Sequence, residues 1–114
     1  MSDCIFCKIA NGEIPSDKIF EDDKVLVFND ISPQSPVHFL VIPKEHIPSI
    51  KYIDEKNIDI INHITLVINK IAKEKGLDDK GYRIVNNCGE FGGQTVEHLH
   101  FHVLGGRQLM WPPG

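Results

Sequence analysis

The amino-acid sequence predicts an α+β fold in a single domain, 1–114, with a five-stranded antiparallel sheet, a short N-terminal helix and one long helix. Three observations lead to this prediction. Short apolar runs bounded by Gly, Pro and Asp are typical of strands, and one longer segment has the apolar periodicity of a helix. The order of the predicted elements is helix, three strands, long helix and two strands. Strands joined by hairpins pair antiparallel, and we expect both helices to pack on one side of the sheet.

The first predicted elements are a short helix and a hairpin. Residues 4–11 have the composition of a short helix, which Gly12 would end. The segments 18–21 and 25–28 lie on either side of the pair Asp22-Asp23, which is typical of a turn. Two strands around such a turn predict a β-hairpin.

A loop and a third strand follow the hairpin. Residues 30–36 include two prolines, which are excluded from central strands because they lack a backbone N–H. Residues 37–42 are mostly apolar and predict a strand that ends at Pro43, with His38 at its start.

The segment 54–75 predicts the long helix. Its isoleucines recur at spacings of three and four residues, which places them on one buried stripe: Ile61, Ile64, Ile68 and Ile71. Asp54 is expected to cap the amino end, and Gly76 is suited to the position after the carboxyl end. His63 lies at the edge of the stripe and is expected on the helix surface.

The chain ends with two more predicted strands. Residues 82–85 are the fourth, and a glycine-containing loop, 87–93, leads to the fifth. The fifth strand, 98–104, begins His-Leu-His-Phe-His. Side chains of a strand point alternately to its two faces. We therefore expect the histidines on one face and three apolar residues in the core: Leu99, Phe101 and Val103.

Three interpretations of this histidine row remain open. The simplest is a solvent-facing strand that carries histidine by chance, and three imidazoles on one face disfavour it. Imidazole is also a common metal ligand, and because it titrates near neutral pH it suits catalysis. At about 3.3 Å per residue, the backbones of His98 and His102 are roughly 13 Å apart, too far for one ion to bind all three rings. The spacing favours a row of catalytic groups, with room for a metal at one end.

The loop before the histidines offers donors for an anion. In Gly92-Gly93-Gln94-Thr95, adjacent glycines allow backbone N–H groups to approach a ligand closely, and Gln and Thr add side-chain donors. A flexible turn explains the same residues equally well. The motif is not a P-loop, because the Lys-Ser/Thr ending is absent, and the sequence has no G-x-S-x-G elbow of a serine hydrolase.

Nucleophilic catalysis by an imidazole fits these parts. A neutral histidine attacks phosphorus and divides one difficult displacement into two easier ones, provided that its other ring nitrogen donates a hydrogen bond. His100, in the middle of the row, is the best-placed nucleophile. We expect no catalytic metal, because the sequence has no acidic cluster suited to magnesium.

Cys4 and Cys7 form a second motif. A Cys-x-x-Cys pair without a preceding strand is unsuited to thioredoxin-type redox chemistry. Two thiolates at this spacing are half of a tetrahedral zinc site, whose other ligands would be distant histidines. The alternative is a pair of ordinary buried thiols. Cys88 has no partner in the sequence and is interpreted as an ordinary thiol.

Charge and composition argue against several classes of protein. The formal net charge of −4 and the lack of a Lys/Arg-rich run disfavour nucleic-acid binding, while local donors remain compatible with a small anion. The odd number of cysteines, three, disfavours a secreted disulfide framework. The sequence has no apolar run long enough to span a membrane and no signal-peptide-like segment. We therefore expect a soluble, cytoplasmic protein with no membrane association.

Together these motifs resemble those of the histidine triad (HIT) superfamily. The run 94–107 contains its motif His-φ-His-φ-His-φ-φ, in which φ is an apolar residue. The runs 30–34 and 38–44 and the Trp-Pro-Pro-Gly ending resemble the histidine-triad nucleotide-binding branch, Hint. The resemblance covers nearly the whole chain.

The resemblance implies a homodimer in which two five-stranded sheets join into one continuous sheet. It also implies a purine nucleotide ligand of the AMP or GMP type. The implied activity is hydrolysis of nucleoside 5′-phosphoramidates or related adenylates through a covalent nucleotidyl-histidine.

The resemblance also assigns roles by position. His100 is then the nucleophile, His102 and Thr95 lie on the phosphate and leaving-group side, and His38 supports the active histidines. The other positions implied for nucleotide contact are Asn87, Gln94 and the backbone around Val96 at the phosphate, Asp30 at the ribose, Phe6, Ile9, Ile14, Phe28, Ile31 and Leu40 around the base, and Trp111, which would reach toward the site of the partner subunit.

Members with an N-terminal Cys-x-x-Cys resemble a zinc-bearing subset, in which the remaining ligands match His46 and His98. The zinc would be structural, with all four positions closed. Glu97 stands where animal relatives carry an aromatic residue, which bears on leaving-group preference. Two alternatives stay open: a nucleotide-binding regulatory or interaction module with incidental turnover, and a zinc hydrolase with its metal at His100 and His102.

Overall fold

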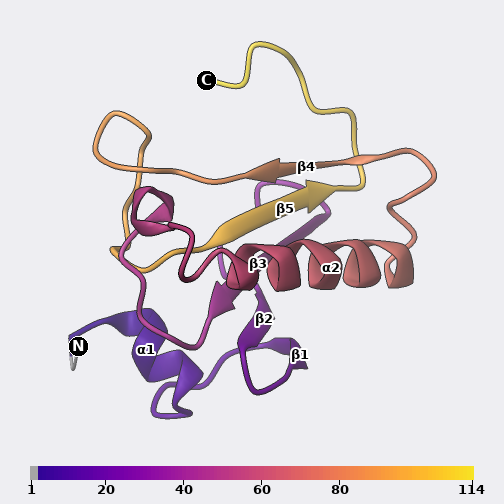
Figure 1. The fold of residues 1–114 in the computed structure, drawn as a ribbon. Helices are drawn as coiled ribbons and strands as arrows, with labels where there is room; N and C mark the ends of the chain where they lie inside the picture. The colour runs from indigo at the N-terminus through magenta and orange to yellow at the C-terminus, as the bar shows by residue number, and fades with distance from the viewer. Residues whose placement is uncertain (1–2) are drawn as a thin grey trace.

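The computed structural model describes residues 3–114 and confirms the predicted α+β fold. Within this range five antiparallel strands form one sheet in the order β1-β2-β3-β5-β4 (Figure 1). The strands are β1 Lys18–Glu21, β2 Val25–Asn29, β3 Val37–Pro43, β4 Tyr82–Val85 and β5 Phe101–Gly105. The helices are α1 Ile5–Ala10, the 3₁₀ helix η1 Ile50–Tyr52 and α2 Asp59–Glu74.

The predicted hairpin joins β1 to β2. At its turn, Oδ1 of Asp22 accepts hydrogen bonds from the backbone N–H groups of Lys24 and Val25, each at 2.8 Å. One carboxylate oxygen thus satisfies two turn donors, which is the physical reason that Asp is common at such turns.

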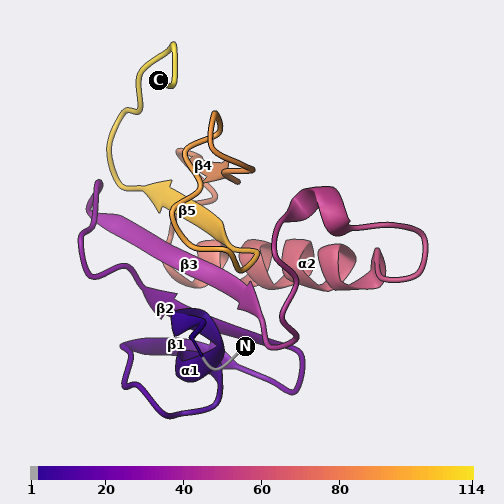
Figure 2. The same ribbon diagram turned by 90° about the vertical axis from the view of Figure 1, so that its left-hand side faces the viewer.

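The two helices cover opposite faces of the sheet, so the expectation that both pack on one side is wrong. In β2, Val25 and Val27 belong to the apolar cluster that α2 covers, whereas Leu26 and Phe28 belong to the cluster that α1 covers. In Figure 2, α1 lies in front of the sheet and α2 behind it. Strands that are apolar without alternation are buried on both faces, and the run 25–28 already carried that signal.

Helix α2 begins later than the predicted segment 54–75. The predicted stripe is present, since three of its isoleucines are buried and Ile61 packs partly buried against the same cluster. The predicted cap at Asp54 is wrong, because its carboxylate accepts from the backbone N–H of Lys56 at 2.9 Å in a turn before the helix. Ile58 precedes α2 instead and makes no side-chain capping bond. No helix within residues 3–114 is both long and apolar enough to cross a membrane.

Glycines with positive φ follow both α-helices, as predicted. Gly12 has φ +80° and Gly76 has φ +73°. After α2, the N–H of Leu77 donates to the carbonyl of Ala72 at 2.8 Å, and the N–H of Gly76 donates to Lys73 at 3.0 Å. These two bonds satisfy carbonyls of the last turn, and the left-handed conformation they require favours glycine.

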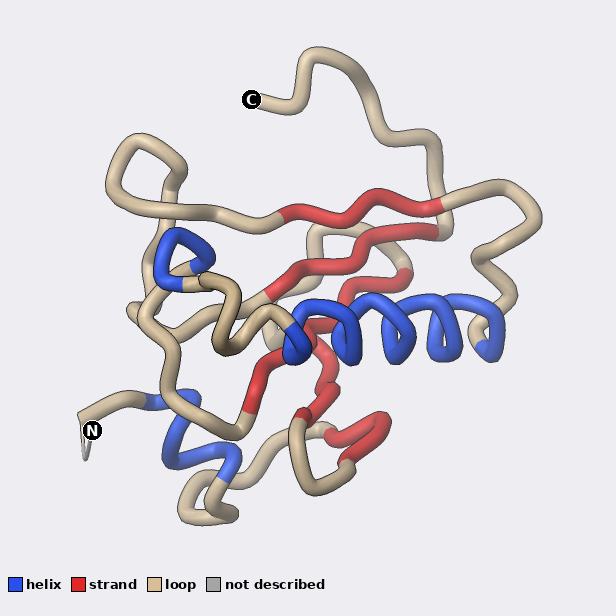
Figure 3. Tube along the Cα trace, viewed as in Figure 1, coloured by secondary structure: helices blue, strands red, loops and turns tan. Residues whose placement is uncertain are grey.

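Regular pairing of the last strand begins only at Phe101, so the prediction of a strand over 98–104 is wrong for its first three residues. The backbone N–H of Leu99 donates instead to the carbonyl of Ile47, at 2.6 Å, in the loop after β3. The first two histidines of the row therefore lie in a loop (Figure 3). The predicted alternation nevertheless holds, because all three apolar residues are buried in the cluster beneath α2: Leu99, Phe101 and Val103.

Candidate active site

His100 is a buried imidazole held by one backbone hydrogen bond. Only 4% of the residue is exposed, and its Nδ1 lies 2.7 Å from the backbone carbonyl of His98. A carbonyl can only accept, so Nδ1 carries the proton and the lone pair is on Nε2. The ring thus meets the condition for a nucleophilic imidazole, a free lone pair on one nitrogen while the other donates a hydrogen bond.

His38 and His102 form a second pair of rings. The backbone N–H of Gln34 donates to Nδ1 of His38 at 3.1 Å, so a neutral His38 carries its proton on Nε2. That Nε2 lies 2.9 Å from Nδ1 of His102 and 3.5 Å from a carboxylate oxygen of Asp30. Because Nδ1 of His102 accepts, the proton of His102 is on its Nε2.

Burial keeps these imidazoles neutral at pH 7. It lowers the pKa of His38 and of His100 below the ordinary histidine value, although the negative charge of Asp30 opposes the shift. Burial, together with repulsion from His100 and His38, lowers the pKa of His102 to about 4. The centroids of the His100 and His102 rings are 5.2 Å apart. The site therefore offers one unprotonated ring nitrogen, on His100, and one N–H donor, on His102, in two neighbouring rings.

An apolar cluster adjoins the histidines on the face that α1 covers. The ring of Phe6 meets that of His100 edge to face, with centroids 5.0 Å apart. Val96, predicted near the phosphate, packs against this cluster. Ile31 does not join it and is 98% exposed. Of the six residues that the resemblance assigns to the base, Ile14 packs against the cluster and four belong to it: Phe6, Ile9, Phe28 and Leu40.

The loop between β4 and the histidines is shaped by two side-chain amides. Asn87 donates to a carbonyl within the loop at 2.7 Å. Gln94 donates to the carbonyls of Pro48 and Val96 at 2.8 and 2.9 Å. Both predicted phosphate-binding amides thus already donate to carbonyls of the protein, in this loop and, for Gln94, also in the segment after β3. The donors left for an anion include backbone N–H groups, the second N–H of the Asn87 amide and Thr95, which is exposed.

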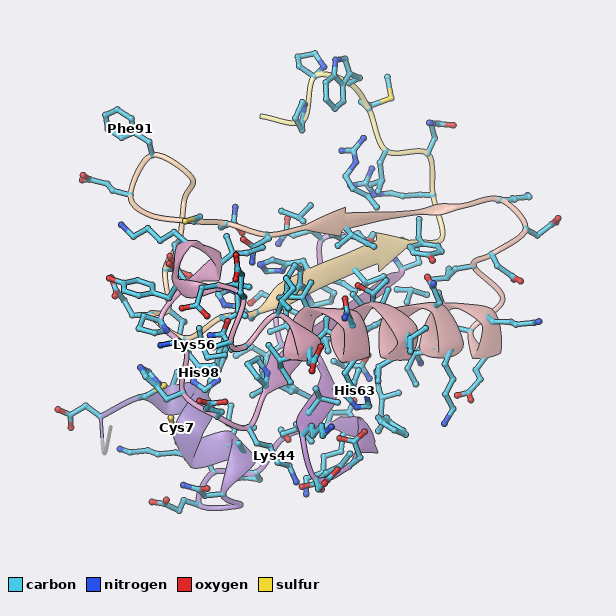
Figure 4. All side chains as sticks on the ribbon, viewed as in Figure 1. Cys7, Lys44, Lys56, His63, Phe91 and His98 are labelled. Atoms are coloured by element: carbon cyan, nitrogen blue, oxygen red, sulfur yellow. The ribbon has the colours of Figure 1, made fainter. Side chains whose placement is uncertain are left out.

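The four residues of the predicted metal site meet beside the amino end of α1. The candidate ligand atoms of Cys4, Cys7, His46 and His98 all lie within 4.8 Å of one another. Nδ1 of His98 is 3.3 Å from Sγ of Cys4, 3.5 Å from Sγ of Cys7 and 3.2 Å from Nδ1 of His46. Figure 4 shows Cys7 and His98 next to each other. Ligands about 2.0–2.3 Å from a tetrahedral ion are roughly 3.3–3.8 Å apart, so these four residues can hold one metal ion.

A backbone bond also orients His98. Its Nε2 donates to the carbonyl of Pro43 at 2.8 Å, which leaves the lone pair on Nδ1, the nitrogen nearest the thiols. Metal-binding histidines commonly donate their second nitrogen to a carbonyl in this way. The ring is fully buried.

Comparisons with known proteins give one answer. Residues 3–110 match the family model described as scavenger mRNA decapping enzyme C-term binding. A histidine triad protein from Clostridium difficile is 60% identical, with a TM-score of 0.94 and 96% of each chain covered. The chain belongs to the histidine triad (HIT) family. A HIT family hydrolase from Legionella pneumophila is 48% identical, with a TM-score of 0.97 and coverage of 98% of this chain and 100% of that chain. A histidine triad nucleotide-binding protein from Candida albicans is 37% identical, with a TM-score of 0.82 and coverage of 96% and 83%.

In this HIT chain the C-terminal tail lies apart from the sheet. Trp111 is 79% exposed, and the tail extends away from the strands (Figure 1). Arg83 of β4 donates from Nη2 to the carbonyl of Met110 at 2.9 Å and so ties the tail to the sheet edge. The role that the resemblance gives to Trp111 involves a second subunit and stays a prediction.

Several groups of the HIT site were not identified from the sequence. The N–H of Gln34 and the carbonyls of Pro43 and His98 each fix the tautomer of a histidine ring. Asn86 donates from Nδ2 to the carbonyl of His100 at 2.9 Å. Backbone N–H and carbonyl groups occur all along the chain, so the sequence does not indicate which of them will contact a histidine ring. The one partial signal is that Gln34 belongs to the run 30–34 that resembles the family motif.

Proposed function

We propose that this HIT protein hydrolyses purine nucleoside 5′-phosphoramidates or acyl-adenylates to the nucleoside monophosphate, through a nucleotide bound covalently to His100. The observation that carries the proposal is the bond from Nδ1 of His100 to the His98 carbonyl, which leaves a lone pair on Nε2 of a buried, neutral ring. Two proteins similar to this chain support the proposal: the hydrolase from Legionella pneumophila supports hydrolysis, and the nucleotide-binding protein from Candida albicans supports a nucleotide ligand.

The proposed reaction has two displacements at the α-phosphorus. In the first, Nε2 of His100 bonds to phosphorus, the bond to the leaving group breaks, and a leaving amine departs with a proton from solvent. In the second, water attacks phosphorus, the bond to Nε2 breaks, and the water proton passes to solvent. Throughout, Nδ1 of His100 keeps its proton and its bond to the His98 carbonyl, which disperses the positive charge on the ring.

The surrounding residues have supporting roles in this proposal. The N–H on Nε2 of His102 stabilises negative charge on the phosphoryl oxygens, with Thr95 beside it, and His38 holds His102 in the required tautomer. Asp30 takes the ribose hydroxyls, and the cluster around Phe6 takes the base. The phosphate contacts are assigned to the segment that contains Asn87, Gln94 and Val96.

A catalytic metal is not part of the proposal. Because the N–H of Gln34 occupies Nδ1 of His38, Nε2 of that ring carries a proton and cannot also ligate a cation. Where the two rings meet, the only lone pair is on Nδ1 of His102, and it accepts the hydrogen bond from Nε2 of His38. The protein residues alone supply the nucleophile and the donors.

We also propose a structural zinc ion bound by Cys4, Cys7, His46 and His98. The donor set fits: two thiols and two ring nitrogens lie at the separations of a tetrahedron, and His98 is already oriented by Pro43. The ion would tie α1 to the segment that precedes β5. Elemental analysis of protein purified without added metal should give about one zinc per chain, as expected for a closed four-ligand site; a value near zero would remove the claim.

A homodimer with a continuous sheet is the third part of the proposal. Its support is the edge strand β4, where Ile84 is 47% exposed, whereas the opposite edge, β1, carries the ion pair Lys18–Glu21 at 2.9 Å. Charged edges resist pairing and apolar edges favour it. Light scattering should give the mass of two chains.

The test of the proposed function is a set of matched substrates. Adenosine and guanosine 5′-phosphoramidates should be hydrolysed, and the cytidine and uridine compounds should be hydrolysed much more slowly. ATP should not be hydrolysed at this site. If none of the phosphoramidates or adenylates is turned over while AMP still binds, the protein is instead a nucleotide-binding module.

A further inference from the structure

The loop between β2 and β3 meets the turn after β5. Gln34, in this loop, donates its backbone N–H to Nδ1 of His38. Its carbonyl accepts from Nε and Nη2 of Arg107 at 3.3 and 2.9 Å. The Nη1 group of the same guanidinium donates to the carbonyl of Gln108 at 3.0 Å. One side chain therefore links the turn after β5 to the residue that sets the His38 tautomer.

Close packing beside Arg107 supports the same contact. Gly106 has φ +92°, and a Cβ built on it would lie 2.9 Å from Cβ of Pro36. Only glycine fits both this approach and this backbone conformation. The turn and the loop are thus fitted to each other at two neighbouring positions.

We propose that Arg107 is a positioning residue, which holds Gln34 so that His38 donates from Nε2 to His102 and His102 presents its own N–H to the substrate. Arg107 does not touch the rings and acts through the backbone of Gln34. The role of the N–H on Nε2 of His102 toward the substrate rests on the proposed function. The tautomers of His38 and His102 are properties of the protein alone.

The consequence of losing this support follows from proton placement. Without the N–H of Gln34, the proton of His38 is free to move to Nδ1, and Nε2 then faces Nδ1 of His102 as a second lone pair. That contact at 2.9 Å is favourable only if His102 moves its own proton to Nδ1. Its Nε2 then loses the N–H, so one missing backbone donor changes both rings.

The identity of the side chain distinguishes this role from simple attraction of an anion. The guanidinium places two donors on one carbonyl and a third on another, which a single ammonium cannot reproduce. Arg107→Lys therefore keeps the charge and removes the fork. If Arg107 only attracted phosphate, Lys would restore function.

The experiment compares Arg107→Lys and Arg107→Met with Arg83→Lys as the matched control. Arg83 also donates to a backbone carbonyl, but in the C-terminal tail rather than in the β2–β3 loop. Two-bond ¹H–¹⁵N correlation spectra of ¹⁵N-histidine-labelled protein report the tautomer of each ring. Steady-state kinetics with adenosine 5′-phosphoramidate report kcat and KM separately.

In both Arg107 variants, His38 and His102 should lose their single Nε2–H tautomer, and kcat should fall about tenfold or more with little change in KM, as expected for misplaced catalytic groups. Arg83→Lys should leave both tautomers as in the wild type. Unchanged tautomers in Arg107→Lys, or full recovery of kcat by Lys after loss in Met, would overturn the proposal. If the wild type has no hydrolase activity and the Arg107 variants still show altered tautomers, the positioning role stands and the proposed function is refuted.

Gly106→Ala provides a second route to the same result. It pushes on Pro36 without changing any charge or donor, and it should shift the tautomers in the same direction as Arg107→Lys. If the amide spectrum shows that an Arg107 variant is unfolded, this variant decides the question. A folded Gly106→Ala protein with wild-type tautomers would contradict the proposal.

Discussion

His98 and His100 are two residues apart, on the same short segment, and present opposite ring nitrogens. His98 donates from Nε2 to the Pro43 carbonyl and directs Nδ1 at two thiols. His100 donates from Nδ1 to the His98 carbonyl and keeps Nε2 free. The side chains are identical, so the difference comes from the backbone carbonyl that each ring meets. Tautomer selection by the backbone thus directs one ring of the row toward the candidate metal site and leaves the other with the lone pair of the proposed nucleophile.

The largest expected effect separates the two histidines by substitution. His100→Gln should lower kcat for adenosine 5′-phosphoramidate by at least about 10³-fold, because the nucleophile is gone, while bound zinc and AMP affinity stay close to wild type. His98→Gln should do the reverse, losing zinc with a smaller loss of kcat, since its carbonyl still accepts from His100. Steady-state kinetics and elemental analysis of both variants measure these opposite effects on kcat and on zinc content. Equal loss of turnover in the two would break the comparison.

Metal removal should affect folding more than chemistry. The cluster joins α1 to the segment before β5, so chelation or Cys7→Ser should lower Tm by roughly 10 °C, as the loss of a structural metal removes a few kcal/mol. Turnover measured well below Tm should fall by less than about tenfold, given that no step passes through the ion. Calorimetry and kinetics on the same chelated sample give both numbers. Abolished turnover with unchanged Tm would favour the zinc-hydrolase alternative.

The pH dependence of stability should sharpen the contrast within the catalytic rings. Burial, with repulsion from His100 and His38, depresses the folded pKa of His102 to about 4. Below about pH 6.5 the unfolded chain takes up a proton that the folded ring resists, so this contribution is present above that pH and is lost as pH falls toward 4. The effect for His102 is at most on the order of 3 kcal/mol.

Urea unfolding of the wild type and of His102→Gln at pH 7.5 and pH 5 measures this contribution. The wild type should lose more stability between the two pH values than the variant, and His38, His100 and Asp30, which face the ring, are present in both. Identical pH dependence in the two proteins would show that His102 does not titrate as the structure indicates.

The smallest expected effect concerns the leaving group. Glu97, next to His98, is exposed. Glu97→Phe should lower KM for phosphoramidates with aromatic leaving groups by a few-fold, about what one aromatic contact provides, with unchanged KM for the unsubstituted compound. A uniform change in KM for both substrates would indicate a general electrostatic effect instead.

The sequence predicted the elements better than their faces. The β4 residues, the hairpin and the isoleucine stripe follow from short-range patterns, and the resemblance gathered all four metal-site residues that the structure brings together. The run 25–28, which is apolar without alternation, indicated a strand covered on both faces, but it does not encode which helix covers which face. Ile31, which the resemblance assigns to the base, is exposed and lies outside the α1 cluster, and its role stays a prediction.

The tautomers lay beyond sequence reasoning for a different reason. They depend on which backbone N–H or carbonyl comes within hydrogen-bond distance of each ring, and folding determines this through contacts such as Arg107 with Gln34. Alternation in His-Leu-His-Phe-His predicted that the rings share a side. It left room for a metal at one end of the row, but it did not predict which ring nitrogen each histidine would present.

The most direct test is to trap the reaction intermediate. Rapid acid-free quenching of wild-type protein with a labelled adenosine 5′-phosphoramidate, followed by mass spectrometry and ³¹P NMR, locates the nucleotide. We expect adenylate on Nε2 of His100 and none on His38, His98 or His102. Adenylate on another side chain, or full turnover with no covalent nucleotide at any time point, would contradict it.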